Sequence, residues 1–399
     1  MDFGAKEERT LLLMRSAVTG RIDEQMRAWD EAAWLGVLEE LQIQTAAAVT
    51  AGIALECCSC ASASQAFLEE FGRTVKKWHE LMARQDEVLG LLREASIPVV
   101  VLKGAAAAAN YPNPTLRCMG DIDLIVAPGD FDRALNLLLD AGFVRLYPDL
   151  YYQRHESLGK QGFPSVQLHR WFSLNQRGEE NKAINNAIVA GISQAEVIDV
   201  AGFSVPVLAP LENGLVLIEH MRHHLLSGLG LRQVLDWLFF VENCMDDKLW
   251  CEFESLAREC GLLEVTLAMT ALCKRYLGLK RDVLWADSVD IDLVNELMQY
   301  VFSQGNMGRK VEAGSGKTKT VLKHFSSPIS ALRYLYTGGM VNWKAAGRYA
   351  VLRPLVPFYQ IGHLAKMGFA RKAAVSDLVE EAKFSRVEID LLERLNALR

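Results

Sequence analysis

Two aspartates at alternate positions of a short apolar run are the residues with the clearest chemical potential. Asp121 and Asp123 belong to the run D-I-D-L-I-V at 121–126. Because side chains alternate along a strand, both carboxylates are expected on one face. Paired hard oxygen ligands of this kind suit Mg²⁺, or Mn²⁺ in its place, when the ion is shared with substrate phosphates. The pair therefore indicates metal-assisted phosphoryl chemistry, in which one or two ions clamp an in-line displacement.

A glycine upstream of the aspartates adds a second half to this pattern. Lys103-Gly104 follows the β-branched run 97–102, which predicts a buried strand, and precedes the helix-forming segment 105–110. Glycine at such a junction lets the backbone approach a phosphate, and a helix N-terminus offers unpaired N–H groups. Neither half is specific alone. Their order, strand–glycine–helix–D-x-D strand, predicts a site for a phosphate and a metal.

The same stretch resembles a known family. It carries L-K-G-x-A at 102–106, Tyr-Pro at 111–112, R-x-M-G-D-I-D-L-I-V at 117–126 and a helix ending in G-F at 142–143. This pattern is similar to the nucleotidyltransferase superfamily that includes DNA polymerase β, and specifically to its bacterial branch labelled uncharacterised nucleotidyltransferase. The resemblance covers roughly residues 85–275, because later segments also match: an L-H-x-W strand at 168–171, a His-rich helix at 219–224, Arg232 and Asp236.

The resemblance implies a reaction and a role for each matching residue. A nucleoside monophosphate would pass from an NTP to an acceptor hydroxyl or phosphate, with release of pyrophosphate. Asp121 and Asp123 would be catalytic and hold Mg²⁺, whereas Arg117 would neutralise phosphate charge or brace the loop. Lys103 is expected to point away, because of strand alternation. The implied nucleotide-binding residues are Gly104, Lys103, Ala105, Arg117, Gly120 and His224. The acceptor is open: a small molecule, a peptide or protein, or an RNA.

One position departs from the superfamily pattern. A third carboxylate is expected on a neighbouring strand, where it completes a metal site and helps deprotonate the attacking hydroxyl, but the matching residue is Gln167. An amide ligates weakly and cannot accept a proton at neutral pH. His169, on the same strand face, is the candidate catalytic base in its place. Glu156 is another stand-in if 151–156 forms the adjacent strand. The alternative is a catalytically impaired nucleotide-binding or interaction protein.

Three histidines on one expected helix form a second polar group. His220 and His224 are four residues apart on one helix face, and His223 is adjacent. The spacing suits a metal, yet the sequence H-M-R-H-H lacks the H-E-x-x-H pattern. Two interpretations stay open: a polar wall of the active cleft that contacts the base or the acceptor, and a packed helix face.

The hydrophobic pattern predicts an α+β fold, with a small mixed sheet flanked by N-terminal and C-terminal helical regions, and the resemblance implies that this sheet is a nucleotidyltransferase core. Four regions are expected: an N-terminal helical region (1–95), the core (96–175), a helical domain completing the cleft (176–310), and a basic segment with a C-terminal helix (311–399). Further strands are expected at 150–154 and 165–169, with a strand pair at 196–207. Helices are expected at 130–141 (closed by Gly142), 211–226, 230–244, 248–259, 261–277, 290–304 and 373–398.

Charge is unevenly distributed along the chain. The 43 basic and 49 acidic side chains give a net charge of −6, which argues against global attraction to nucleic acid. Between Glu312 and Asp377 there is no acidic residue, but ten Lys and Arg are interleaved with aromatic residues. This basic segment, 317–372, suits an anionic partner such as RNA, a nucleotide or a membrane surface. The alternative is a solvated face, and an RNA-binding protein that uses this segment alone is a third functional hypothesis.

Other features mostly exclude function classes. A chain of 399 residues with 50% hydrophobic residues is not wholly disordered, and it has no apolar run long enough to predict a membrane span. Eight cysteines are too few for a disulfide framework, which favours a reduced, cytoplasmic protein. The C-C-S-C run at 57–60 lacks the partner ligands of a zinc site, so buried helix cysteines are expected. Gly314–Thr318 resembles the end of a P-loop, but Val311 occupies a position that requires glycine, and a flexible loop is expected.

Overall fold

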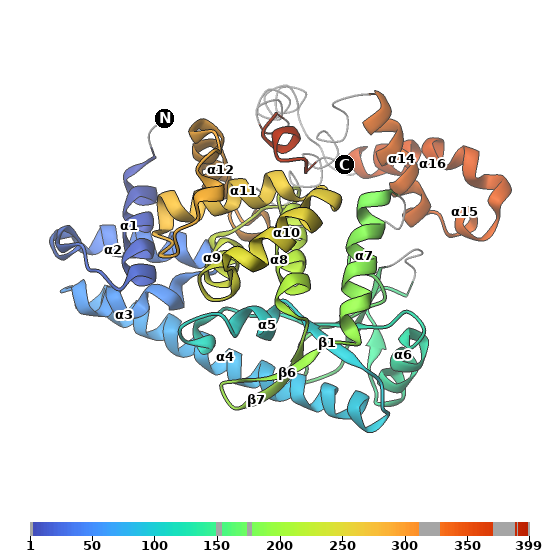
Figure 1. Cartoon of the computed structure of the whole chain (residues 1–399), viewed down its shortest axis with the longest axis horizontal. Helices are drawn as coiled ribbons and strands as arrows, with labels where there is room; N and C mark the ends of the chain where they lie inside the picture. Colours follow the sequence, from blue (N-terminus) through green and yellow to red (C-terminus); the bar gives the residue numbers. More distant parts are fainter. Residues whose placement is uncertain are drawn as a thin grey trace.

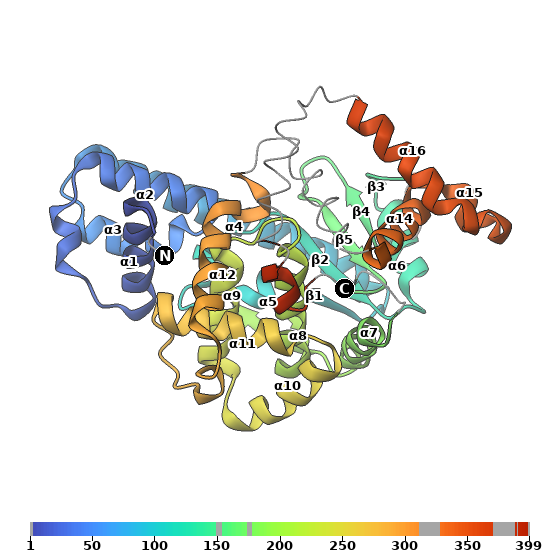
Figure 2. The ribbon, with the colours of Figure 1, turned by 90° about the horizontal axis from the view of Figure 1, so that it is seen from above.

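The computed structural model describes residues 3–148, 154–173, 178–310, 328–369, 388 and 390–397. Its architecture is the predicted α+β fold, with one five-stranded mixed sheet, a separate two-stranded sheet and many helices (Figure 1). The N-terminal helices and the helices of 328–369 lie at opposite ends of the molecule, with the sheet between them (Figure 2).

Four helices precede the sheet: α1 (Ala5–Thr19), α2 (Glu31–Ile43), α3 (Ala47–Cys57) and α4 (Ala61–Glu94). The N-terminal helical region expected at 1–95 is thus divided into separate helices, because local caps end one helix or begin the next. Gly20 adopts a φ of 72° after α1, and the Asp30 side chain accepts the amide of Ala33 at the start of α2. Helix α4 is 34 residues long and extends from the N-terminal helices to the sheet (Figure 1).

The central sheet has the strand order β1-β2-β5-β4-β3. Only the β2–β5 pair is parallel among its described neighbours. All five residues of β2 are buried, as expected for a strand that is covered on both faces. The strands are β1 (Val99–Leu102), β2 (Ile122–Val126), β3 (Val144–Arg145), β4 (His155–Gly159) and β5 (Val166–His169); α5 (Gly104–Ala108) and α6 (Phe131–Asp140) lie between them in sequence.

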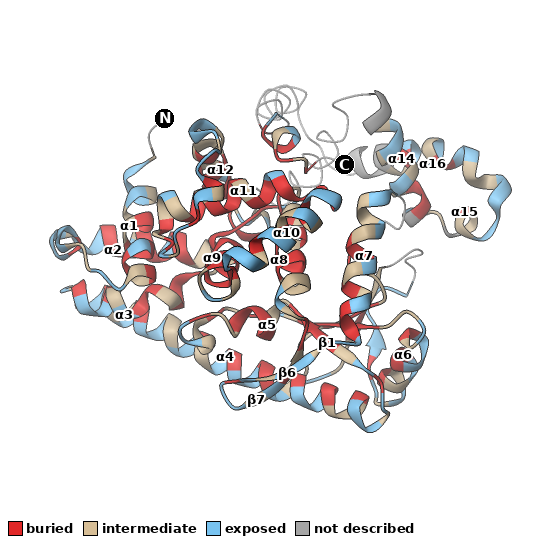
Figure 3. Ribbon diagram, viewed as in Figure 1, coloured by how far each residue is buried: buried red, intermediate tan, exposed pale blue. Residues whose placement is uncertain are grey.

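The two faces of the sheet belong to different apolar cores. Leu102 and Ile125 join the larger core, which also contains α8, α9, α11 and α12, whereas Val101, Leu124 and Leu168 join a second core with α4 and α6. Asp123 shares the face of Ile125, because strand residues two apart project from the same side. Figure 3 shows buried residues on both sides of the sheet. The aspartate face therefore points toward the helices that follow the sheet in sequence.

After residue 178, the described part of the chain forms helices and one hairpin, β6 (Glu196–Val200) and β7 (Phe203–Val207), which confirms the predicted strand pair. Helix α7 and the helices of 328–369 were not predicted individually. The helices are α7 (Glu179–Ile192), α8 (Pro210–His224), α9 (Leu231–Cys244), α10 (Asp247–Glu259), α11 (Leu263–Leu272), α12 (Ile291–Gln304), α14 (Pro328–Asn342), α15 (Lys344–Arg348) and α16 (Val356–Phe369).

Several predicted bounds are wrong. The strand expected at 150–154 lies largely outside the described residues, and the strand that pairs with β5 is β4, at His155–Gly159. The helix expected at 261–277 begins at Leu263 and becomes a π-helical turn over Cys273–Leu277. Most of the helix expected at 373–398 lies outside the described residues. The predicted closure of α6 is confirmed, because Gly142 adopts a φ of 90° just after the helix.

The division into four regions stays a prediction. One continuous apolar core joins the first helices to those of the third region, and it includes Trp34, Leu41 and Trp237. No helix within the described residues is long and apolar enough to cross a membrane.

The loop between α8 and α9 requires glycine at position 228. Gly228 has a φ of 111°, and a Cβ there would lie 2.1 Å from the backbone nitrogen of Gly308. We expect Gly228→Ala to lower the free energy of unfolding by about 2–3 kcal/mol, because two backbone segments would have to separate. Urea unfolding measures this change. The control is Gly72→Ala in α4, where nothing lies within 4 Å of the new Cβ; an equal loss in both variants would contradict the close approach.

Candidate active site

Four predicted site residues lie on one face of two paired strands. The parallel register places Asp123 of β2 opposite Gln167 of β5. Each β5 side chain contacts the aspartate two residues before its register partner. Gln167 Nε2 donates to Asp121 Oδ2 at 2.6 Å, and His169 Nε2 lies 3.1 Å from Asp123 Oδ1. His169 is fully buried and Asp123 is 4% exposed. The structure therefore brings together the two aspartates and the two residues expected around the missing third carboxylate.

Lys103 also points into this group, so the expectation that it points away is wrong. Its Nζ lies 3.0 Å from Asp123 Oδ1. The reason is its backbone: Lys103 has φ 54° and ψ −130°, outside the strand region, and serves as the N-cap of α5. Strand alternation ends at Leu102, and the turn redirects the next side chain toward the aspartates. A cation thus already sits against the predicted metal ligand.

The two aspartates differ in their proton affinity. Burial, and then the charge of Asp123, raise the pKa of Asp121. Burial would also raise the pKa of Asp123, but the Lys103 ammonium and the His169 hydrogen bond hold it well below its usual range. Burial lowers the pKa of His169, so its imidazole is neutral and donates from Nε2 to Asp123. Asp123 is therefore ionised, whereas Asp121 would need a further cation nearby to lower its pKa.

The donor set fits a hard divalent cation. Among the described residues, no hydrogen-bond or ion-pair partner contacts Asp121 Oδ1 or Asp123 Oδ2, so each aspartate retains one free oxygen. The Lys103 ammonium against Asp123 shows that this position stabilises positive charge. No group of three or more His, Cys, Asp or Glu side chains within the described residues is arranged to hold a metal. An ion at the aspartates would therefore need phosphate oxygens and water as its other ligands, as Mg²⁺ commonly has.

Glu156 cannot replace the third carboxylate. The antiparallel register places it opposite Leu168, whose side chain lies in the core on the other face of the sheet. Its carboxylate lies 3.8 Å from Arg145 of β3. The residues that do share the aspartate face of β4 are Ser157, opposite Gln167, and His155, whose ring centroid is 4.8 Å from that of His169. The prediction placed this strand about five residues too early, which is why His155 was missed.

Arg117 braces the loop before β2 and does not extend into the site. It is 3% exposed and makes a two-pronged ion pair with Asp236 of α9, with Nε–Oδ1 and Nη2–Oδ2 distances of 2.8 and 2.7 Å. The Tyr111 hydroxyl donates to the same carboxylate at 2.7 Å. This buried cluster ties the Gly104–Asp121 segment to the helical half of the chain. Of the two roles implied for Arg117, the geometry supports the brace.

The histidines of α8 form one polar cluster, called here the histidine wall, in which His224 is buried and His220 and His223 are half-buried; they do not form a metal centre within the described residues. His220 Nε2 and His224 Nε2 are 2.9 Å apart. Burial lowers the pKa of His223 and His224 to about 3, and nearby cations including Lys103 and Arg154 add to the effect. Arg154, which sequence reasoning missed, donates to the Phe172 carbonyl at 2.8 Å.

The remaining predicted residues have no side-chain contact that assigns them a role. Gly104 begins α5 with a φ of 35°, Ala105 is buried behind it, and Gly120 is exposed next to Asp121. Of the cysteines at 57–60, which were expected to be buried in helices, Cys57 is buried at the end of α3, whereas Cys58 and Cys60 are half-buried in the turn before α4. Gly314–Thr318 lies outside the described residues, as do five of the ten cations of the basic segment. Within its described part, Arg333 and Arg348 are exposed.

Comparison with known families agrees with this geometry. The sequence model of a family described as uncharacterised nucleotidyltransferase matches residues 35–278, which is more than half of the chain. The chain therefore belongs to the uncharacterised nucleotidyltransferase family, the branch that its D-x-D pattern resembles. The family carries nucleotidyl transfer as its general function. A search of curated proteins found no match.

The ion pair between Arg117 and Asp236 gives a thermodynamic prediction. Removing one partner leaves a buried unpaired charge, so Arg117→Met or Asp236→Leu should each lower the free energy of unfolding by about 3–5 kcal/mol. The double variant should lose clearly less than the sum, because neither charge is then stranded. Urea unfolding of all four proteins measures the coupling. Additive losses would show that the two side chains do not depend on each other.

The histidine wall gives a pH prediction. Neutral His223 and His224 cannot take up a proton near pH 6, whereas both are protonated in the unfolded chain below about pH 6.5. Unfolding then binds protons, so the free energy of unfolding should fall as pH drops from 6.5 toward 5, by at most about 1.4 kcal/mol per pH unit for each histidine. Urea unfolding at several pH values measures the slope.

The matched variants are His223→Gln and His79→Gln. His223→Gln should make the dependence on pH shallower, because one titrating group is removed. His79 is exposed on α4, and its replacement should leave the slope unchanged. A slope that is the same in all three proteins would contradict the assignment of a neutral wall.

Proposed function

We propose that the protein is a Mg²⁺-dependent nucleotidyltransferase that transfers a nucleoside monophosphate from an NTP to an acceptor hydroxyl or phosphate and releases pyrophosphate. One observation carries the proposal: Asp123 in β2 and Asp121 just before it lie on one side of the strand, each keeps an oxygen without a partner among the described residues, and a lysine already supplies positive charge. Membership of a nucleotidyltransferase family supports the NTP as substrate. The base, the acceptor and the choice between Mg²⁺ and Mn²⁺ are open to experiment.

In the proposed reaction the acceptor oxygen attacks the α-phosphorus, the bond from that phosphorus to the bridging oxygen breaks, and pyrophosphate leaves with the electron pair. Mg²⁺ bound by the two aspartates would neutralise phosphate charge and favour the ionised acceptor. Lys103 is placed to neutralise further phosphate charge. The hydroxyl proton passes to a carboxylate oxygen of the pair, because Nε2 of His169, the predicted base, already donates to Asp123 and its Nδ1 is buried.

His169 has a positioning role in this scheme. Its Nε2–H donates to Asp123 Oδ1, which leaves Asp123 Oδ2 directed for metal binding. Gln167 does the same for Asp121 through Oδ2. Gly104 and the Ala105 amide lie next to this face and are assigned to the triphosphate, as the family resemblance implies. The α8 histidines are assigned to the base or the acceptor.

The direct test is turnover of the aspartate variants. Asp121→Asn and Asp123→Asn should each reduce Mg²⁺-dependent transfer from α-labelled NTPs by at least about a hundredfold, because each removes a metal ligand and its charge. The assay supplies each of the four NTPs, Mg²⁺ or Mn²⁺ and lysate of the native host, and follows label transfer and pyrophosphate. Asp132→Asn, on an exposed ion pair with Arg170, is the control. Wild-type turnover in both site variants would refute this site.

A second candidate function is nucleotide binding without efficient turnover. The observation that favours it is Gln167, which stands opposite Asp123 and donates a hydrogen bond where the superfamily places a carboxylate. Gln167→Glu separates the two functions. If the third carboxylate is all that is missing, this variant should gain transfer activity at least about tenfold, because it adds a metal ligand and a proton acceptor. A loss of activity instead would show that the amide is part of a working site.

A further inference from the structure

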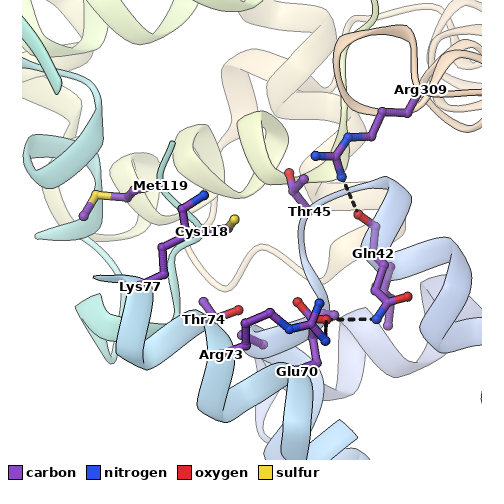
Figure 4. Close-up of a pocket in the computed structure, with 12 residues that line it drawn as sticks. Gln42, Thr45, Glu70, Arg73, Thr74, Lys77, Cys118, Met119 and Arg309 are labelled. Atoms are coloured by element: carbon purple, nitrogen blue, oxygen red, sulfur yellow. Dashed lines mark hydrogen bonds and ion pairs between the residues drawn. The ribbon is translucent and has the colours of Figure 1, made fainter. Parts of the chain in front are cut away.

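A cavity lies beside the segment that leads to Asp121. It has a volume of about 330 Å³ and lies between the α2–α3 turn, the middle of α4 and the segment that leads into β2 (Figure 4). That volume is at the lower end of the range of about 300–1,000 Å³ typical of small-molecule sites. The labelled side chains around it come from α2, the following turn, α4, residues 118–119 and Arg309.

The lining is positively charged. Arg73, Lys77 and Arg309 face one acidic residue, Glu70, which leaves a net charge of +2. One oxygen of Glu70, Oε2, accepts from both Arg73 and Gln42 at 2.9 Å. Arg309 donates to the Gln42 carbonyl at 3.0 Å. Lys77 makes no ion pair or hydrogen bond within the described part of the chain, and its ammonium extends toward Cys118 in Figure 4.

Unused hydrogen-bond donors line the same cavity. The N-terminal residues of α3, Ala47 and Ala48, are among the lining, and no side chain caps that helix. The hydroxyl of Thr45, just before the helix, is buried without a hydrogen-bond partner. Thr45 also has a φ of 54°, which a non-glycine residue rarely adopts. Free amides at a helix N-terminus, a free hydroxyl and three cations around one void form a binding site for an anion.

The cavity is joined to the reaction centre through the backbone. Cys118 and Met119 line it, and Asp121 follows two residues later. A Cβ at Gly104 would lie 3.9 Å from Met119 Sδ, so the glycine turn is adjacent. Arg232 donates to the Cys118 carbonyl at 3.2 Å and holds this segment in place. The cavity and the aspartates are therefore linked through the short segment 118–121.

We propose that this cavity, lined by Lys77, Arg73, Arg309 and Thr45, binds the phosphate-bearing end of a small molecule that reacts at Asp121 and Asp123. The assignment of the reaction rests on the proposed function, whereas the phosphate binding does not. Two molecules of that reaction can supply the phosphate: the NTP through its triphosphate tail, and a phosphorylated acceptor. Leu41, Ala47 and Met119 provide an apolar wall for the rest of the ligand.

Inorganic tripolyphosphate in metal-free buffer is the probe, because it binds without the aspartates. Calorimetry at physiological ionic strength should show that Lys77→Glu weakens tripolyphosphate binding at least about tenfold, since an attractive charge becomes repulsive. Lys76→Glu, on the same helix and 3.9 Å from Glu80, should leave it unchanged. Arg309→Gln tests the opposite wall, and thermal unfolding verifies that each variant is folded. No binding to the wild type, or equal binding in all variants, would overturn the proposal.

NTP binding, measured in the presence of Mg²⁺, shows which molecule places its phosphate in the cavity. If Lys77→Glu weakens NTP and tripolyphosphate binding alike, the cavity takes the triphosphate tail. If NTP binding is unchanged, the cavity takes the phosphate of the acceptor. Asp123→Asn should retain metal-free tripolyphosphate binding. Failure of the proposed function would appear as unaltered turnover in the aspartate variants, which is a separate result from failure of this site.

Discussion

Two carboxylates held side by side on a buried strand cannot both ionise without a cation, and this constraint organises the site. Lys103 supplies one positive charge to Asp123, with His169 as hydrogen-bond donor, but Asp121 retains a raised pKa. The face is thus only partly neutralised. A divalent ion shared with phosphates would complete the compensation, which is the electrostatic reason, beside the family, for proposing metal-assisted phosphoryl transfer.

The rest of the fold keeps that face in place. The parallel register of β2 and β5 aligns the aspartates with Gln167 and His169. The antiparallel register of β4 places His155 against His169. Two contacts hold the segment before β2 in position. Arg117 forms an ion pair with Asp236 of α9, and Arg232 donates a hydrogen bond to the Cys118 carbonyl. The same segment forms part of the cationic cavity, so the anion site and the reaction centre share one rigid support.

Sequence reasoning reached the fold class, the aspartate pair and the family, because these depend on local period and on a motif with fixed spacing. It failed where the answer depends on pairing between distant segments. Lys103 was expected to point away, but a residue with positive φ ends the strand alternation. Glu156 was a stand-in for the third carboxylate only if 151–156 formed the adjacent strand, but the register of β4 places it on the other face. The burial of Arg117 is set by α9, more than a hundred residues away, and the cavity by four separate segments.

The central claim is that Asp121 and Asp123 together bind a divalent ion with the nucleotide. Electron paramagnetic resonance of Mn²⁺, titrated into the protein with a non-hydrolysable NTP analogue, measures this without turnover. The account predicts bound Mn²⁺ that depends on the nucleotide in the wild type and is lost when both aspartates are replaced by asparagine. Mn²⁺ bound with the same affinity and stoichiometry by the double variant would contradict it.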